Sequence, residues 1–308
     1  MDEYDVVVVG GGAAGLAAAV ALARSRRRVL VVDAGEPRNA PAEGIHNFLT
    51  REGTPPHQLL ADGRDDVRQY GGEVRDGRAT SATHLDDAFE VALADGDRVR
   101  ARRLLAATGV VDRLPPVEGL EERWGRDVLH CPYCHGYEVR DQAIGVLATG
   151  PNAEHQALMF AQLSPSVTLL AHLAPPSAES RARLAAAGVR VVAGTVVAVE
   201  TDRDTLCGVR LEDETVVPLQ ALVVAPYSVV SSPLLASLGV APVPHPSGLG
   251  ESVEVDLMGR TGVPGVFATG NLTDLGAQVM GAAAAGTRAG AAINMDLIEA
   301  DLSERLSA

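Results

Sequence analysis

The sequence predicts an α/β protein that contains two βαβ units, because a strand, a glycine-containing turn, a helix and a second strand follow one another twice along the chain. The first set covers residues 5–33 and the second covers residues 143–170. In both sets the strands are short apolar runs, and the helical pattern follows the turn directly. Two such units predict two Rossmann-like dinucleotide-binding domains.

The first unit begins with the apolar run of residues 5–9, which ends in a G-x-G-x-x-G turn. A helix is expected from Leu16 to about residue 24, and a buried strand over residues 29–33 ends in an acid. The turn's first glycine permits a tight bend, the second admits a pyrophosphate, and the third lets helix and strand pack closely. The helix N-terminus would hold the pyrophosphate, and the acid would accept hydrogen bonds from ribose hydroxyls. The predicted dinucleotide-binding residues here are Gly10, Gly12, Ala13, Ala14, Gly15, Asp33 and Ala34.

The second unit has a strand and glycine turn over residues 143–150, a helix from Asn152 to Leu163, and a strand over residues 167–170. Alternating strands are expected between residues 189 and 224. Residues 265–271 then predict a strand that leads into a glycine turn, and a helix follows over residues 282–297. Proline clusters mark expected crossings between domains, at residues 114–116 and 242–246.

Charge and composition exclude several classes of function. The chain carries 26 basic and 40 acidic residues, a net charge of −14, so its surface should repel nucleic acid and anionic membranes. It contains no lysine, which excludes Schiff-base chemistry and a Walker-type phosphate loop. No apolar run reaches membrane-spanning length. The strand pattern begins near Tyr4 and leaves no room for a secretory signal, so we expect a cytoplasmic protein.

Two of the three cysteines form a C-x-x-C motif, Cys131-Pro132-Tyr133-Cys134. This spacing allows reversible disulfide formation, and such motifs often open a helix whose N-terminus stabilises a thiolate. We therefore favour redox chemistry over a metal site, since a four-ligand zinc site usually needs a second such pair. His130 and His135 flank the motif, so a Cys₂His₂ zinc site stays open as the alternative. The third cysteine, Cys207, is expected to be structural or incidental.

Four motifs together resemble the low-molecular-weight thioredoxin reductase family over essentially the whole chain: residues 10–15, 107–109, 131–134 and 265–271. The resemblance implies an FAD-binding domain of residues 1–114 and 245–308, a NADPH-like domain of residues 115–244 that carries the C-x-x-C, and a homodimer. It also implies that Cys134 faces the flavin and that Cys131 exchanges with the external substrate.

The resemblance further implies contacts with the flavin. Gly270-Asn271 stands where reductases have Gly-Asp, and backbone N–H groups after Gln278 would point at the flavin's N1–C2=O edge. A polar loop with His46 would lie along the isoalloxazine. The flavin-contacting residues implied in this way are His46, Asn47, Thr108, Gly109, Gly270, Asn271, Gln278 and Val279.

His135 departs from the reductase pattern, because reductases generally carry an acid directly after the second cysteine. Cys134-His135 is instead similar to the dithiol oxidases that close disulfides in natural products such as gliotoxin and holomycin. A histidine there can take a thiol proton near neutral pH and return it. Glu138 would orient this histidine. We therefore expect Cys131, Cys134 and His135 to be catalytic.

The second glycine turn lacks features that NADPH needs. It reads Ala148-Thr149-Gly150-Pro151-Asn152-Ala153, where the family has G-x-G-x-x-A. The paired arginines that bind the 2′-phosphate in the family are missing after the next strand, and the first arginines are Arg181 and Arg183. The resulting prediction is an FAD-dependent oxidase that passes electrons from a small-molecule dithiol to O₂ and gives H₂O₂. The alternatives are a thioredoxin reductase supplied by NADPH or reduced ferredoxin, and a catalytically idle flavin-binding module.

Overall fold

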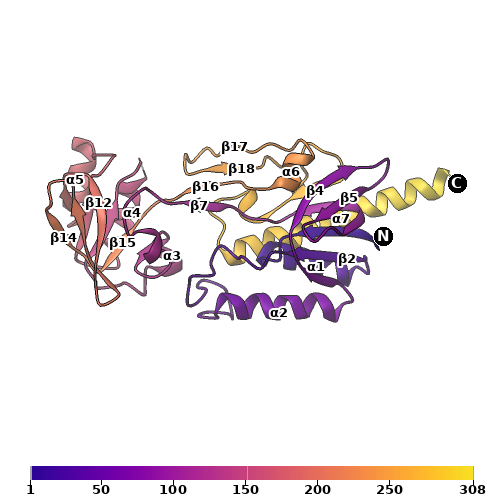
Figure 1. Ribbon diagram of the computed structural model, residues 1–308, viewed down its shortest axis with the longest axis horizontal. Coiled ribbons are helices and arrows are strands. Elements are labelled where there is room, and N and C mark those ends of the chain that lie inside the picture. Colours follow the sequence, from indigo (N-terminus) through magenta and orange to yellow (C-terminus); the bar gives the residue numbers. More distant parts are fainter. Residues whose placement is uncertain (1, 151, 308) are drawn as a thin grey trace. The chain divides into compact units, whose positions relative to one another are not determined.

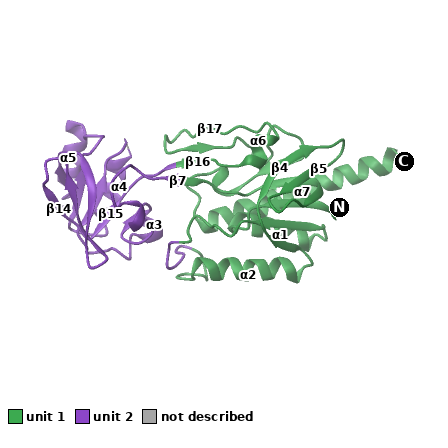
Figure 2. Cartoon of the chain, in the orientation of Figure 1, with its two compact units in different colours: residues 1–40, 48–111, 228–308 green, residues 41–47, 112–227 purple. Residues whose placement is uncertain are grey.

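The computed structural model describes residues 2–150 and 152–307, which divide into two compact units (Figure 2). Unit 1 consists of residues 1–40, 48–111 and 228–308. Unit 2 consists of residues 41–47 and 112–227. Both chain ends thus contribute to unit 1, and the middle of the chain forms most of unit 2.

Unit 1 contains a mixed seven-stranded sheet among its described residues, with strand order β3-β2-β1-β6-β5-β4 and with β19 paired to β6 (Figure 1). The long strand β6 pairs with antiparallel β5 along its first half and with parallel β19 along its second half. The carboxyl ends of β1, β2, β6 and β19 therefore lie at one edge of the sheet. The strands are β1 (Asp2–Val9), β2 (Val29–Asp33), β3 (Glu73–Asp76), β4 (Ala79–His84), β5 (Phe89–Leu93), β6 (Arg98–Ala106) and β19 (Val266–Ala268).

The helices of unit 1 are α1 (Ala13–Arg24), α2 (Pro56–Gln69), α6 (Pro233–Ser237) and α7 (Val279–Ser307), and η2 (Gly270–Leu272) is a short 3₁₀ turn. Val6 to Val9 are all buried because both faces of β1 are covered. Helices α1 and α7 approach so closely that a Cβ on Gly286 would lie 1.9 Å from the Ala14 carbonyl oxygen, and one on Gly290 would lie 2.7 Å from that of Ala18. Only glycine allows this contact.

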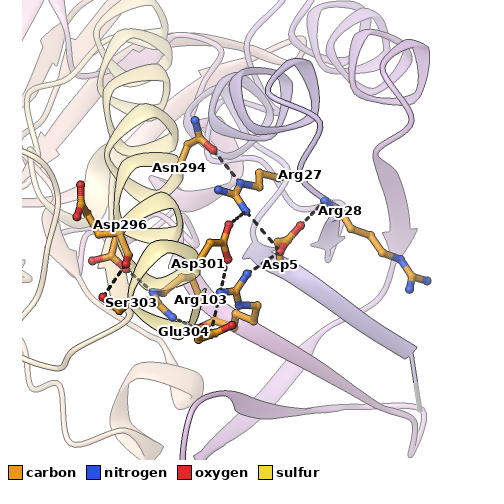
Figure 3. Close-up of polar contacts among 11 residues, drawn as sticks. Asp5, Arg27, Arg28, Arg103, Asn294, Asp296, Asp301, Ser303 and Glu304 are labelled. Atoms are coloured by element: carbon orange, nitrogen blue, oxygen red, sulfur yellow. Dashed lines mark hydrogen bonds and ion pairs between the residues drawn. The ribbon is translucent and has the colours of Figure 1, made fainter. Parts of the chain in front are cut away.

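An arginine–carboxylate network joins α7 to the start of unit 1 (Figure 3). Arg27 donates to Asn294 and to Asp301, each at 2.8 Å. Arg103 on β6 forms an ion pair with Asp296. The Arg27 and Asp301 side chains are only 13% and 24% exposed, so this pair is better shielded than an ordinary surface ion pair. The network fixes the carboxyl-terminal helix against the first βαβ unit.

Unit 2 contains an all-parallel sheet of order β11-β10-β9-β15-β8 and an antiparallel sheet of order β12-β13-β14. Apolar clusters cover both faces of the parallel sheet. Its helices are α3 (Pro132–His135), α4 (Ala153–Phe160) and α5 (Ala178–Ala186), with the 3₁₀ turn η1 (Glu121–Arg123). The strands are β8 (Val128–Leu129), β9 (Ile144–Leu147), β10 (Val167–Leu170), β11 (Arg190–Val192), β12 (Val196–Asp202), β13 (Thr205–Leu211), β14 (Val216–Pro218) and β15 (Ala221–Val223).

The chain passes between the units at β7 (Val111–Arg113) and β16 (Tyr227–Val229), which pair with each other. The proline-rich segment over residues 242–246 contains β17 (Val243–Pro244), which pairs with β18 (Glu251–Ser252) inside unit 1. Residues 228–244, placed by the sequence in the middle domain, lie in unit 1. There α6 is bound to β4 because the Ser237 hydroxyl bonds both the N–H and the carbonyl of Ala82, at 2.8 and 3.1 Å.

Within the described residues, no helix combines the length and the apolar character that crossing a membrane requires.

Candidate functional site

The glycine turn of unit 1 has the close contacts that its sequence predicts. Gly10 has φ +108°, and a Cβ there would lie 2.3 Å from the Ala107 carbonyl oxygen. A Cβ on Gly15 would lie 1.9 Å from the Gly10 carbonyl oxygen. The turn thus needs glycine at both positions, and it brings the end of β1 against the end of β6.

Asp33 closes the turn from the end of β2. Its Oδ1 accepts a hydrogen bond from the Gly11 N–H at 3.0 Å, and its Oδ2 forms an ion pair with Arg64 on α2. Arg64 also donates to Asp76 at 2.6 Å, and hydrogen bonding to Asp76 raises the pKa of Arg64. These contacts hold the carboxylate at the sheet edge where a ribose would bind. Arg64 was not predicted, because nothing in its local sequence links it to the turn.

The ends of β6 and β19 lie beside the same turn. The Thr269 N–H donates to the Ala106 carbonyl at 3.0 Å, and a Cβ on Gly270 would lie 3.0 Å from the Ala14 Cβ. Thr108 and Gly109 follow β6 one residue after its end, and Gly109 has φ +67°. The structure therefore gathers segments 10–15, 107–109 and 270–271 at one edge, as parallel strand ends require.

Asn271 holds the loop that leads into α7. Its Nδ2 donates to the carbonyls of Asp274 and Ala277, both at 3.0 Å. An aspartate carboxylate has no hydrogen to donate, so it could not replace these two bonds. The loop ends at Gln278, whose carbonyl accepts from the Ala282 N–H at 2.8 Å, and α7 begins at Val279. Asparagine in place of the reductase aspartate thus has a structural reason within unit 1.

The residues at this edge fit a dinucleotide. Gly12 is the N-cap of α1 and has no side chain to cap the first-turn N–H groups, and a Cβ there would meet nothing within 4 Å. Open space before uncapped N–H groups at a helix N-terminus suits a pyrophosphate. FAD would be held by this turn together with Asp33. The assignment of individual residues to the flavin stays a prediction.

The C-x-x-C motif of unit 2 forms the start of the short helix α3. Cys131 is its N-cap, and the Cys134 N–H donates to Cys131 Sγ at 3.2 Å, an arrangement that stabilises negative charge on the sulfur. Both cysteines are partly buried. The next turn is tight, because a Cβ on Gly136 would lie 2.3 Å from the Pro132 carbonyl oxygen and 2.6 Å from Leu163 Cδ1.

His135 lies directly after this cysteine pair, at the end of α3. Burial lowers the pKa of its imidazole, while the charge of Glu138 acts in the opposite direction. Burial is the larger influence, so the ring is neutral at pH 7 and can accept a proton. The His46 ring, whose Nε2 lies 3.5 Å from Glu138 Oε1, also lowers the pKa of His135.

His46 and Asn47 lie in segment 41–47, which belongs to unit 2. Asn47 Nδ2 donates to the Tyr133 carbonyl at 2.5 Å, between the two cysteines in sequence. The sequence did not indicate these contacts with the dithiol helix. The predicted position of both residues along the flavin stays a prediction.

The neighbours of the cysteines show no metal-ligand grouping. His130 Nδ1 lies 2.9 Å from the Val224 carbonyl oxygen. Over residues 2–150 and 152–307, no three His, Cys, Asp or Glu side chains gather as they would around a metal ion. Cys207 lies on β13, and its side chain is exposed.

The second glycine turn also differs from the first in structure. Ala148 is fully buried, and its carbonyl accepts from the N–H groups of Leu173 and Ala174 at 3.2 and 3.1 Å. Burial lowers the pKa of His172, which follows β10, so no cation stands there at pH 7. Arg183 on α5 is paired with Glu154, in the first turn of α4, at 3.0 Å. Pro151 of this motif lies outside the described residues, and Arg181 is exposed.

Known proteins resemble this chain in sequence and in structure over nearly its whole length. The solved structure of HlmI has 41% sequence identity and a TM-score of 0.91, and the alignment covers 99% of this chain and 96% of that one. Thioredoxin reductase sirT from Leptosphaeria maculans is 29% identical over 98% of this chain and 97% of its own length. The expected fold class and the resemblance to thioredoxin reductase-like flavoproteins are confirmed.

A probable thioredoxin reductase from Arthroderma benhamiae is 36% identical over 152 residues, which are 47% of this chain and 38% of that protein. For the first three curated relatives, the match covers between 38% and 56% of their length. The model of one family spans nearly the whole chain, from residue 4 to residue 290. On this match the chain belongs to the pyridine nucleotide-disulphide oxidoreductase family.

Proposed function

We propose that this oxidoreductase is an FAD-dependent dithiol oxidase that closes a disulfide in a small-molecule dithiol, with O₂ as the electron acceptor. The observation that carries the proposal is His135, partly buried directly after the Cys131–Cys134 pair, where burial lowers the pKa of its imidazole. An acid at this position would be ionised and negatively charged at neutral pH. A neutral imidazole can instead take up and return thiol protons without a fixed charge.

The proposed exchange conserves atoms, electrons and protons. A substrate thiolate attacks Cys131 of the enzyme disulfide and releases the Cys134 sulfur; the second substrate sulfur then displaces Cys131 and closes the substrate disulfide. His135 takes the proton of an attacking thiol and returns it to a departing cysteine sulfur. When bound, FAD would carry the two electrons of the resulting cysteine dithiol to O₂, which yields H₂O₂.

The second glycine turn supports electron delivery from the dithiol and not from NADPH. The position after β10 carries His172, whose pKa is lowered by burial, and nearby Arg183 is paired with Glu154. The acid in the first turn of α4 further opposes a phosphate at that helix end.

The test is to mix the purified yellow protein with dithiothreitol in air, and separately with NADPH, and to follow flavin absorbance and peroxide. We expect bleaching and peroxide with the dithiol only. The Cys134→Ser variant should keep its flavin and lose peroxide formation. Fast bleaching by NADPH without peroxide from dithiols would contradict the proposal.

A thioredoxin reductase is the second candidate, favoured by the names of thioredoxin reductase sirT and the probable thioredoxin reductase from Arthroderma benhamiae. Electrons would then run from NADPH or a reduced ferredoxin through the same cysteines to a protein disulfide. Bleaching by either donor, together with reduction of thioredoxin, would establish it. An unchanged oxidase activity of Cys134→Ser would instead point to an idle flavin-binding module.

We also propose a cytoplasmic protein whose net charge of −14 keeps it from binding nucleic acid or anionic membranes. That it is a homodimer is proposed on the family resemblance alone. Sedimentation of the flavin-loaded protein tests the oligomeric state, and a monomer at micromolar concentration would contradict it.

A further inference from the structure

Segment 41–47, which we call the strap, is attached to unit 2 at three points although the chain on both sides of it belongs to unit 1. Pro41 packs so closely on Gly125 that a Cβ there would lie 2.3 Å from the Pro41 Cβ. Asn47 Nδ2 donates to the Tyr133 carbonyl at 2.5 Å, and His46 Nε2 lies 3.5 Å from Glu138 Oε1. The strap therefore contacts both the cysteine turn and the turn that follows His135.

Groups on the strap and in the turn after α3 act on the pKa of His135 in opposite directions. Glu138 raises the pKa of His135 and His46 lowers it, and Glu43, also on the strap, raises it to a smaller extent. The side chain of His46 is 23% exposed and that of Glu138 is 37% exposed. Three ionisable groups from two segments thus act on one imidazole.

We propose that Glu138 and His46, brought together by the strap, are positioning residues that set how readily His135 exchanges protons with the dithiol. Neither residue needs to touch the substrate. Because His46 pairs with Glu138, the strap determines how much of the Glu138 charge acts on His135. The inference rests on the proposed function only in naming the dithiol as the partner of His135.

Other charged groups near α3 are already engaged or exposed. From α4, Glu154 is paired with Arg183, and His155 is exposed. After α3, the guanidinium of Arg140 stacks 4.1 Å from the centroid of the Tyr137 ring and donates to the Tyr137 carbonyl. The groups whose charge acts on the pKa of His135 are Glu138, His46 and Glu43.

The test is an NMR titration of the imidazole carbons in the flavin-loaded protein, with the His135 signal assigned by its loss in His135→Asn. Glu138→Gln removes a negative charge, so the His135 midpoint should move to lower pH. His46→Gln removes the imidazole that lowers the pKa of His135 and frees Glu138, so the midpoint should move to higher pH. Glu43→Gln should move it in the same direction as Glu138→Gln, but less. The acidic limb of dithiol oxidation should shift in parallel with each midpoint.

Glu138→Asp keeps the charge and should restore most of the wild-type midpoint, and His155→Gln on α4 is the matched control with no shift. Shifts of the same sign in Glu138→Gln and His46→Gln, or an unmoved His135 signal in both folded variants, would overturn the inference. The titration needs no turnover, so it stays decisive if the protein proves to be no oxidase. In that case the midpoints still move while peroxide formation is absent.

Discussion

The two glycine turns occupy the same place in two similar sheets but differ in backbone conformation and in hydrogen bonding. In unit 1 the Gly10 N–H donates to the Val32 carbonyl at 2.8 Å, and in unit 2 the Ala148 N–H donates to that of Leu170 at 2.9 Å. The pairing of strand, turn and next strand is thus conserved between them. Gly10, however, has φ +108°, whereas Ala148 is not in the left-handed region.

The segments after the second strand differ as well. In unit 1, β2 ends at Asp33, which binds the Gly11 N–H and is held by Arg64. In unit 2, the chain after β10 turns back, and Leu173 and Ala174 bond the carbonyl of Ala148. In unit 2, these hydrogen bonds tie the chain after β10 back to the glycine turn. In unit 1, the corresponding place is taken by the bond that holds the Asp33 carboxylate beside the turn. The topology of a dinucleotide domain and its ability to bind a dinucleotide are separable properties.

The two turns should differ most in how a glycine-to-alanine substitution affects stability and flavin binding. Gly10→Ala places a Cβ 2.3 Å from the Ala107 oxygen at a positive φ, so it should cost about 3 kcal/mol of unfolding free energy and abolish flavin binding. Gly150→Ala is the control in unit 2; Gly150 stands at the position of Gly12, and a Cβ there meets nothing within 4 Å. The ratio of flavin to protein absorbance and the thermal midpoint measure both. Equal losses in the two variants would refute the contrast.

The chemistry retained by unit 2 should depend on His135. His135→Asn should lower the rate of dithiol oxidation by about a hundredfold or more, because the thiol protons lose their acceptor. In the wild type, burial lowers the pKa of His135, so activity should persist to a pH below the ordinary range of histidine before it falls. Stopped-flow bleaching by dithiothreitol across pH checks both. A rate in His135→Asn equal to that of His155→Asn would exclude the role.

The two hydrogen bonds donated by the Asn271 side chain should stabilise the loop that leads into α7. Asn271→Asp replaces two N–H donations by repulsion between a carboxylate and two carbonyls, so it should destabilise unit 1 by about 1–3 kcal/mol and weaken flavin retention. Chemical denaturation followed by flavin release measures this. Should the variant bind flavin as tightly as the wild type, the asparagine has no structural role in this loop.

The smallest expected effect concerns acid stability. Burial lowers the pKa of His172, so the folded state binds this proton less well than the unfolded chain. The contribution of His172 to the free energy of unfolding is fully present above the ordinary histidine pKa of about 6.5. It is lost as the pH falls through the lowered pKa of the folded state. His172→Gln should flatten the decline in stability between neutral and acidic pH, measured by denaturant midpoints, whereas exposed His155→Gln should leave it unchanged. A steeper decline in the first variant would have the wrong sign.

The sequence predicts those features whose causes are local. Gly10 and Gly15 can be identified because a tight turn and a helix start need glycine within a few residues of each other, and the run from Val6 to Val9 predicts a strand covered on both faces. The alanine at position 148, where the first turn has a glycine, can also be recognised from the sequence of the turn alone. For the same reason, the C-x-x-C and the adjacent histidine could be predicted as a site.

Features that depend on distant contacts could not be predicted in the same way. The strap belongs to unit 2 because of Pro41 on Gly125 and Asn47 on Tyr133, contacts between segments some 80 residues apart. Residues 228–244 lie in unit 1 because Ser237 binds Ala82, 155 positions earlier. The ion pair of Arg64 with Asp33 likewise depends on how α2 packs, which no short motif specifies.

The close packing of Gly286 and Gly290 against α1 has a consequence for how the protein is made. During synthesis, the first βαβ segment leaves the ribosome long before its partner α7 exists, so its apolar α1 face stays uncovered while residues 112–227 emerge. That middle stretch has its own sheets and core and can fold first. Completion of the flavin-binding half must then be among the last events of folding. Slow elongation or premature termination should therefore yield chains with a structured middle and an aggregation-prone beginning.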